Sequence, residues 1–235
     1  MKRILLAALF AGALLASCIK DDTLYYNVTE MGVLRDGKIV SDTGITYTIT
    51  EMTETYDLTG LDRILFLGDV LASTGDRTYN LRLKSIFSVP TPGIVPAADF
   101  VAPTEPSGDR PALIQTAWFG GGYLNLSLGY FVDDGSKVEH RFTLAEQTVP
   151  EGKDTLFLRL YHNAGTEDEY WDGSSTLEDE GMALISAYYS FPITPFVPTT
   201  DKPRPLKVLY SWHAFEDDMI VPDTVIYSLK GELEK

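Results

Sequence analysis

The chain has 235 residues, enough for one large domain or two small ones with a real hydrophobic core. Its 44% hydrophobic and 23% charged residues are those of a globular protein, and 13 Tyr with 11 Phe favour β-strands. The formal net charge is −15, and it falls to −17 (17 basic against 34 acidic residues) once Lys2 and Arg3 are removed as argued below. A charge of this sign repels nucleic-acid phosphates and anionic lipid headgroups, so neither is an expected partner.

The N-terminal segment has the organisation of a secretory signal. Lys2 and Arg3 precede an apolar run from Ile4 to Leu15 that is too short for a stable membrane span. The sequence Leu-Ala-Ser-Cys that follows resembles a bacterial lipobox, which predicts removal of residues 1–17 and acylation of Cys18, for instance with palmitate. The alternative is a secreted protein whose cysteine falls by chance at the cleavage site. Cys18 is the single cysteine, which excludes an internal disulfide.

Residues 18–25 are then the acylated cysteine and its tether. Within them, Lys20, Asp21 and Asp22 resemble the acidic signal that sends lipoproteins of Bacteroidetes to the cell surface; the alternative is an arbitrary charged tether. We therefore expect a protein of the outer membrane that faces outward. The expected membrane contact is the lipid anchor, in which each buried CH₂ contributes about 0.8 kcal/mol.

The first half of the mature chain, residues 26–99, predicts a small β-barrel or sandwich. Gly44 to Thr50 alternates apolar and polar residues, and further strands are expected from Arg63 to Val70 and from Tyr79 to Val89. Arg35-Asp36-Gly37-Lys38 is a hairpin turn by its Asp-Gly pair. No stretch predicts an amphipathic helix.

A proline-rich segment from Pro90 to Pro111 interrupts this pattern, because proline removes ladder donors. We place a linker at residues 100–111 and a second β-domain at 112–235. The alternative is a long loop within one domain.

The second half contains enough alternating segments for a β-sandwich. Residues from Ile114 to Asn163 predict three consecutive strands of one antiparallel meander, with Leu124, Leu126 and Leu128 on the buried face. Gly120-Gly121-Gly122 precedes a strand and no lysine follows it, so it predicts a bulge or tight turn instead of a phosphate loop.

Three runs in this half are similar to one known family: Trp118 to Leu126, His140 to Leu144, and Leu156 to Asn163. They resemble the NigD-like lipoproteins of Bacteroidetes. The resemblance implies an all-β fold, with an N-terminal OB-like barrel and a C-terminal antiparallel β-sandwich behind a lipobox. It implies no catalytic residues.

An acidic loop is the candidate metal site. Asp168, Asp172 and Asp179 stand at positions 1, 5 and 12 of a partial calcium-loop pattern, with Gly173 at position 6. Tyr170 breaks position 3 and Asp replaces the bidentate Glu. A solvated acidic loop without a metal is the favoured interpretation, so we expect no cofactor, with a structural calcium as the alternative.

Tyr170 and Trp171 in the same loop, with Tyr188 and Tyr189 later in the chain, form a candidate aromatic platform for a sugar. The favoured alternative is that Trp171 and one of the two later tyrosines pack in the core. The three histidines, His140, His162 and His213, are isolated in sequence, so a zinc site would require them to converge.

Three threonines, Thr23, Thr155 and Thr224, follow an aspartate and precede an aliphatic residue, as in the O-glycosylation sequon of Bacteroides; chance is the alternative. Motifs for catalysis are missing, so we expect a non-enzymatic binding or accessory protein whose partner is a surface protein complex or a glycan. The alternatives are a fimbrial or adhesin-type subunit and a polysaccharide hydrolase.

Overall fold

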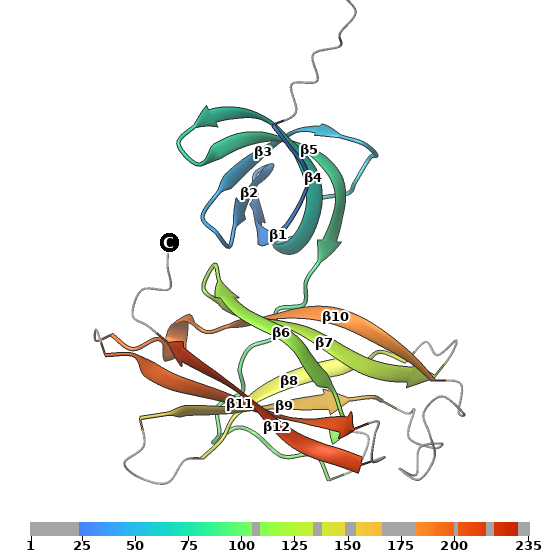
Figure 1. The fold of residues 1–235 in the computed structure, drawn as a ribbon, viewed down its shortest axis with the longest axis vertical. Helices are drawn as coiled ribbons and strands as arrows, with labels where there is room; N and C mark the ends of the chain where they lie inside the picture. Colours follow the sequence, from blue (N-terminus) through green and yellow to red (C-terminus); the bar gives the residue numbers. More distant parts are fainter. Residues whose placement is uncertain are drawn as a thin grey trace, which may run out of the picture.

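The structure is a computed structural model that describes residues 24–104, 109–133, 138–148, 154–165, 182–199, 202–214 and 219–229. It is an all-β protein, as predicted, in which a small closed barrel stands on a two-sheet sandwich (Figure 1). The single helical element described is a 3₁₀ turn, η3, at Thr194–Phe196. Within the described residues, no helix has the length and apolar character needed to cross a membrane.

The barrel closes in the order β1-β2-β3-β5-β4, with β4 returning to pair with β1. Its β3 and β5 pair in parallel and its other pairs are antiparallel, which is the connectivity of a five-stranded Greek-key OB barrel. Its core is formed by fully buried apolar side chains, chiefly Ile39, Ile64, Phe66, Leu81 and Leu83. The strands are β1 (Tyr25–Arg35), β2 (Lys38–Ser41), β3 (Thr46–Met52), β4 (Arg63–Gly75) and β5 (Thr78–Ser88).

The predicted hairpin at Asp36 and Gly37 is confirmed, because Arg35 pairs with Lys38 across it. The alternation predicted from Gly44 onward places Tyr47 in the barrel core, where its ring meets Phe66 edge to face at 5.4 Å.

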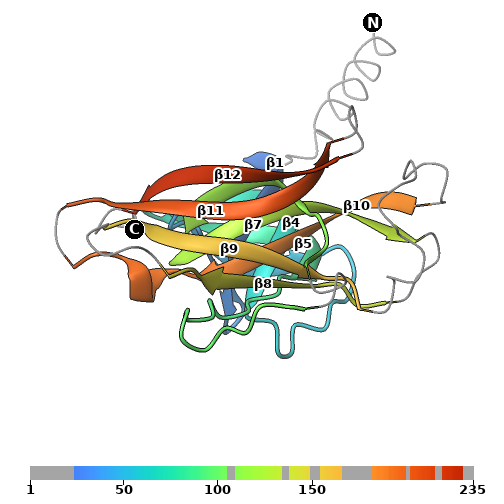
Figure 2. The same cartoon turned by 90° about the horizontal axis from the view of Figure 1, so that it is seen from below.

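The sandwich consists of a three-stranded sheet, β10-β7-β6, and a four-stranded sheet, β12-β11-β9-β8 (Figure 2). All its pairs are antiparallel except β9 with β11, which run parallel. The predicted leucine alternation is confirmed, since Leu124, Leu126 and Leu128 are fully buried between the sheets. Its strands are β6 (Leu113–Gly120), β7 (Tyr123–Asp133), β8 (Arg141–Glu146), β9 (Leu156–Asn163), β10 (Met182–Pro192), β11 (Arg204–Ala214) and β12 (Met219–Leu229).

The prediction of one meander from Ile114 to Asn163 is wrong. Strands β6 and β7 form a hairpin in the smaller sheet, whereas β8 and β9 pair in the larger one, so the chain changes sheets after β7. Alternating hydrophobicity marks which face of a strand is buried and does not identify its neighbour. The actual partner of β7 on its second edge is β10, about sixty residues later in the chain.

The proline-rich segment between β5 and β6 lies along the sandwich. Val95 pairs with β8, because its N–H donates to the Leu144 carbonyl and its carbonyl accepts from the N–H of Glu146. Farther along, the N–H of Arg110 donates to the His162 carbonyl at 2.9 Å. The boundaries placed at residues 99 and 112 remain a prediction.

Candidate functional site: the cleft between barrel and sandwich

The hairpin of β6 and β7 projects from the sandwich toward the barrel and carries the predicted glycine turn (Figure 1). Gly121 and Gly122 have φ of 59° and 87°, the paired positive values that a two-residue type I′ hairpin requires. A Cβ built on Gly120 would lie 2.5 Å from the Cβ of Asp42 in the barrel. The glycines therefore make a tight turn, as predicted, and also allow the barrel to approach the hairpin closely.

A buried polar cluster joins the two domains at this contact. Arg63, at the start of β4, has a side chain only 1% exposed and donates two hydrogen bonds of 2.6 Å to the carboxylate of Asp42. It also donates to the sandwich, at 2.8 Å to Asn125 Oδ1 on β7 and at 3.0 Å to Ser190 Oγ on β10. We call Asp42, Arg63, Asn125 and Ser190 the interdomain clasp.

The residues of the clasp also form hydrogen bonds with one another. Asn125 donates from Nδ2 to the Asp42 carboxylate at 3.0 Å, and Ser190 donates to Asn125 Oδ1 at 2.7 Å. The ring of Tyr123 lies against the guanidinium, with 4.6 Å between the Arg63 Cζ and the ring centroid. A buried pair with this many hydrogen bonds fixes the relative position of its two domains, since sliding would leave a charge unpaired and out of water.

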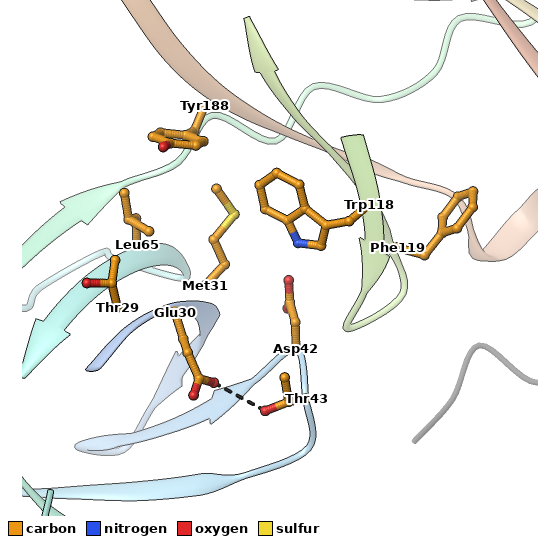
Figure 3. Close-up of a pocket in the computed structure, with 9 residues that line it drawn as sticks. All are labelled: Thr29, Glu30, Met31, Asp42, Thr43, Leu65, Trp118, Phe119 and Tyr188. Atoms are coloured by element: carbon orange, nitrogen blue, oxygen red, sulfur yellow. Dashed lines mark hydrogen bonds between the residues drawn. The ribbon is translucent and has the colours of Figure 1, made fainter. Parts of the chain in front are cut away.

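Beside the clasp lies a cleft of about 350 Å³ whose walls come from both domains (Figure 3). The barrel contributes side chains from β1, from β4 and from the turn after β2, and the sandwich contributes aromatic rings from β6 and β10. The lining residues are Thr29, Glu30, Met31, Asp42, Thr43, Leu65, Trp118, Phe119 and Tyr188.

The sandwich wall of the cleft is aromatic. Trp118 is half-buried near the tip of β6, and Tyr188 on β10 is 40% exposed. Their rings meet edge to face, with centroids 6.5 Å apart and planes at 73°. Such rings offer both apolar area and negative π faces to a ligand.

The barrel wall is acidic. Glu30 accepts hydrogen bonds from Tyr47 Oη at 2.9 Å and from Thr43 Oγ1 at 3.2 Å, the latter drawn in Figure 3. Burial and the neighbouring Glu30 carboxylate raise the pKa of Tyr47 above its usual range, so its hydroxyl remains a donor. Both donors are neutral, and across the described part of the chain no cation forms an ion pair with Glu30.

Two of the three histidines, His140 and His162, converge in the sandwich. Nδ1 of His140 and Nε2 of His162 lie 2.9 Å apart in the sandwich, and Nδ1 of His162 lies 3.4 Å from the Pro111 carbonyl. A carbonyl only accepts, so Nδ1 of His162 carries the proton and its Nε2 accepts from His140. Burial first, and the charge of His140 second, lower the pKa of His162 to about 3. In the regions that the structure describes, no three His, Cys, Asp or Glu gather as metal ligands.

Most residues predicted as sites lie outside the described residues. They are Cys18, Lys20, Asp21, Asp22, Thr23, Asp168, Tyr170, Trp171, Asp172 and Asp179. Of the two described sequon threonines, Thr155 is half-buried just before β9 and Thr224 is exposed on β12. Their glycosylation remains a prediction.

The two later tyrosines have opposite roles. Tyr188 lines the cleft, whereas Tyr189 packs on the sandwich core against Phe142 and donates to the His140 carbonyl. Trp118 was missed as a site because its strand pattern does not show that the barrel faces it. The signal in the sequence that could have identified Trp118 is its position two residues before the three glycines of the turn.

The comparisons with known proteins agree with this fold. The family model described as the NigD-like C-terminal beta sandwich domain matches residues 98–221, just over half of the chain. No curated protein matches this chain. Among solved structures, a NigD-like immunity protein from Bacteroides caccae aligns with a TM-score of 0.59 at 21% identity, covering 88% of this chain and 97% of that one.

Two further structures are similar. A candidate lipoprotein from Bacteroides fragilis has a TM-score of 0.61 at 14% identity, covering 87% of this chain and 98% of that one. A protein of unknown function from Bacteroides vulgatus has a TM-score of 0.60 at 19% identity, covering 86% and 90%. At these identities the likeness is one of fold. With the family model and the two-domain architecture in agreement, the chain belongs to the NigD-like family.

Proposed function

We propose that the protein is a lipid-anchored binding protein of the cell envelope that takes its ligand in the cleft between barrel and sandwich. The observation that carries the proposal is that a cleft of about 350 Å³ opens beside the interdomain clasp. Ligand sites form preferentially at domain interfaces and are usually built in advance. A rigid clasp supports such a site, because the binding energy is not spent on bringing the walls together.

Binding without catalysis is the better interpretation of the cleft. Hydrolysis of a glycoside requires two carboxylates that act on the same bond. Asp42 is held by two hydrogen bonds from Arg63, which leaves Glu30 as the one lining carboxylate without an ion pair. A hydrolase would instead show activity on a panel of polysaccharides that Glu30→Gln abolishes.

The lipobox supports the anchor, and the candidate lipoprotein of similar fold from Bacteroides fragilis is consistent with it. Cys18→Ser should abolish incorporation of labelled palmitate and release the protein from membranes. Outward exposure is tested with protease added to intact cells, where changing Lys20, Asp21 and Asp22 to alanine should protect the protein. Labelling that persists in Cys18→Ser would exclude the anchor.

The cleft is tested by affinity capture of the acylated protein from its native membrane, followed by mass spectrometry. Trp118→Ala with Tyr188→Ala should lose the captured partner or glycan, whereas Phe87→Ala, which removes an exposed ring from the barrel outside the cleft, should keep it. If the unchanged protein, the Trp118→Ala/Tyr188→Ala variant and the Phe87→Ala variant all retained the partner equally, the cleft would not be the binding site. Ladders of the protein itself would favour the fimbrial alternative.

A further inference from the structure

Strand β10 is a free edge of the smaller sheet, because β7 is its one neighbour in the described sheets. The N–H of Ser190 points away from β7, since it donates to the Pro90 carbonyl at 3.0 Å. In an antiparallel ladder every second residue has this orientation. The backbone groups of Leu184, Ser186 and Tyr188 therefore also point outward, and no residue of the described chain pairs with them.

The other edges of the sandwich have features that prevent pairing with another chain, whereas most of β10 lacks them. Native proteins protect sheet edges with charges, prolines, bulges and covering segments. Val95 covers β8, and a register shift interrupts β6 after Ile114. Pro222 and Asp223 lie within β12. Strand β10 has no charged residue and no register shift against β7, and its one proline is its last residue, so it is open to strand addition.

The exposed side chains of β10 are apolar on both faces of the strand. Leu184 is 50% exposed and Tyr188 is 40% exposed, both on the face toward the barrel. Ile185 is 37% exposed on the opposite face. Pairing would therefore stabilise this edge in two ways, because its backbone groups would find partners and its apolar area would leave water.

The sequence of β10 is complementary to itself when a second copy runs antiparallel to it about Ser186. Ser186 then faces its own copy, and Leu184 faces Tyr188 of the second copy. On the other face the branched Ile185 lies opposite the small Ala187. Bulky side chains thus meet smaller or complementary ones, and no like charges are opposed.

From these observations we infer that β10 is a dimerisation edge, to which a second copy of this chain adds its own β10 in antiparallel orientation about Ser186. The pairing runs from Leu184 to Tyr188, because the Pro90 carbonyl already occupies the edge at Ser190. The two barrels then lie at opposite ends of the joined sheet, since each is bound at the Ser190 end of its own β10. The inference does not depend on a ligand in the cleft.

The charge of the chain limits the strength of this contact. Two copies that each carry a net charge of −15 repel one another, so an uncharged strand is where they can approach most closely. We expect a dimer with a Kd on the order of 10 to 100 μM. Added salt should tighten it, because screening weakens the repulsion, whereas a contact held by ion pairs would weaken with salt.

The test uses the chain from residue 18 onward with Cys18→Ser, which leaves no cysteine. Sedimentation equilibrium measures the dimer constant of this chain and of its Ser186→Lys and Thr224→Lys variants, with circular dichroism as the check of folding. Thr224 is an exposed residue of β12, an edge of the other sheet, so it is the matched control. Ser186→Lys places two ammonium groups opposite each other and should weaken the dimer about tenfold or more, whereas Thr224→Lys should not.

Cysteine cross-linking tests the register without relying on the lysine variant. In the same background, Ser186→Cys should give a disulfide-linked dimer under mild oxidation, because residue 186 faces itself with Cα atoms about 5.5 Å apart. Leu184→Cys alone should not, since its two copies are offset by about 13 Å along the strands. A mixture of Leu184→Cys with Tyr188→Cys should cross-link.

A chain that remains monomeric at a concentration on the order of 1 mM would overturn the inference. A dimer that Ser186→Lys leaves intact would also overturn it, as would cross-linking no faster for Ser186→Cys than for Thr224→Cys. If the purified chain is monomeric and Ser186→Lys loses a different protein captured from the membrane, the edge pairs with a strand of that protein instead of a second copy. The proposed function fails separately, when membrane capture is unaffected by the Trp118 and Tyr188 substitutions.

Discussion

The interdomain clasp makes the sharpest prediction about stability. Asp42→Ala removes the two carboxylate oxygens that accept from the Arg63 guanidinium and leaves a charge whose side chain is only 1% exposed. Asn125 and Ser190 still accept from Arg63, but both are neutral. The substitution therefore tests whether the carboxylate is what balances this buried charge.

Breaking a buried ion pair by removing one partner costs about 3 to 5 kcal/mol. The Asp42 carboxylate accepts at 2.6, 2.6 and 3.0 Å, so all its bonds are short enough to count fully. For a chain of this size each 1 kcal/mol shifts the melting temperature by about 2 to 4 °C, which gives an expected decrease of about 6 to 20 °C.

The assay is urea and thermal unfolding of the unacylated chain, followed by circular dichroism and by tryptophan fluorescence. The described tryptophans, Trp118 and Trp212, both lie in the sandwich. We expect the midpoint of Asp42→Ala to fall and the two probes to separate, because the barrel loses its hold on the sandwich. Coincident transitions in the unchanged chain would indicate that the domains unfold together.

The matched control is Glu139→Ala. It removes a carboxylate that is 2.8 Å from an arginine, Arg141, but both side chains are 73% exposed and the midpoint should not move. Combining Asp42→Ala with Arg63→Met should cost less than the sum of the two single changes, since the double variant buries no unpaired charge. A midpoint for Asp42→Ala close to that of Glu139→Ala would refute the reasoning, because it would mean that neighbouring dipoles or water satisfy Arg63.

Three further predictions concern other parts of the molecule. The pKa of His162 is about 3 in the folded chain and 6.5 in the unfolded chain, so the unfolded chain takes up a proton first as the pH falls. The free energy of unfolding should therefore decline below pH 6.5, by up to about 1.4 kcal/mol per pH unit, until pH 3. Urea midpoints measured across this range should decline less steeply for His162→Phe than for the unchanged chain, and parallel declines would contradict the prediction. Gly120→Ala should lower the free energy of unfolding by about 1 to 3 kcal/mol, because the added Cβ would displace Asp42. Gly93→Ala is the control and should leave it unchanged, since nothing lies within 4 Å of its added Cβ. Equal urea midpoints for the two variants would show that Asp42 can move aside at little cost. Calcium over EDTA should not raise the melting temperature, and a rise that Asp172→Asn removes would instead establish the calcium site.

The strand patterns predicted the faces of this fold better than its connections. The leucines of β7 were placed correctly because a period of two follows from backbone geometry alone. The sheet change after β7 was not predictable, since it depends on how two sheets share a core. The OB-like barrel was expected from the family resemblance and not from the strand pattern.

The polar face of β7 shows the same limit. Asn125 and Ser127 suggest a solvated face, yet their exposed fractions are 0% and 6%. Asn125 is buried because the barrel covers it, and its partners Asp42 and Arg63 lie 83 and 62 residues earlier. No local pattern connects residues so far apart, so the clasp and the cleft beside it could be found only from the three-dimensional structure.

The position of the clasp bears on how a ligand would act. A ligand held between the barrel wall and the sandwich wall of the cleft would bridge the same two domains that the clasp joins. By linkage, such a ligand stabilises the joined arrangement by the amount that it prefers it over the separated one. A substitution that weakens the clasp should therefore also weaken ligand binding, even where the substituted residue does not line the cleft. Arg63→Met is the cleaner perturbation for this purpose, since Arg63 does not line the cleft. The rigidity of the domain interface and the affinity of the cleft are thus two consequences of one buried cluster.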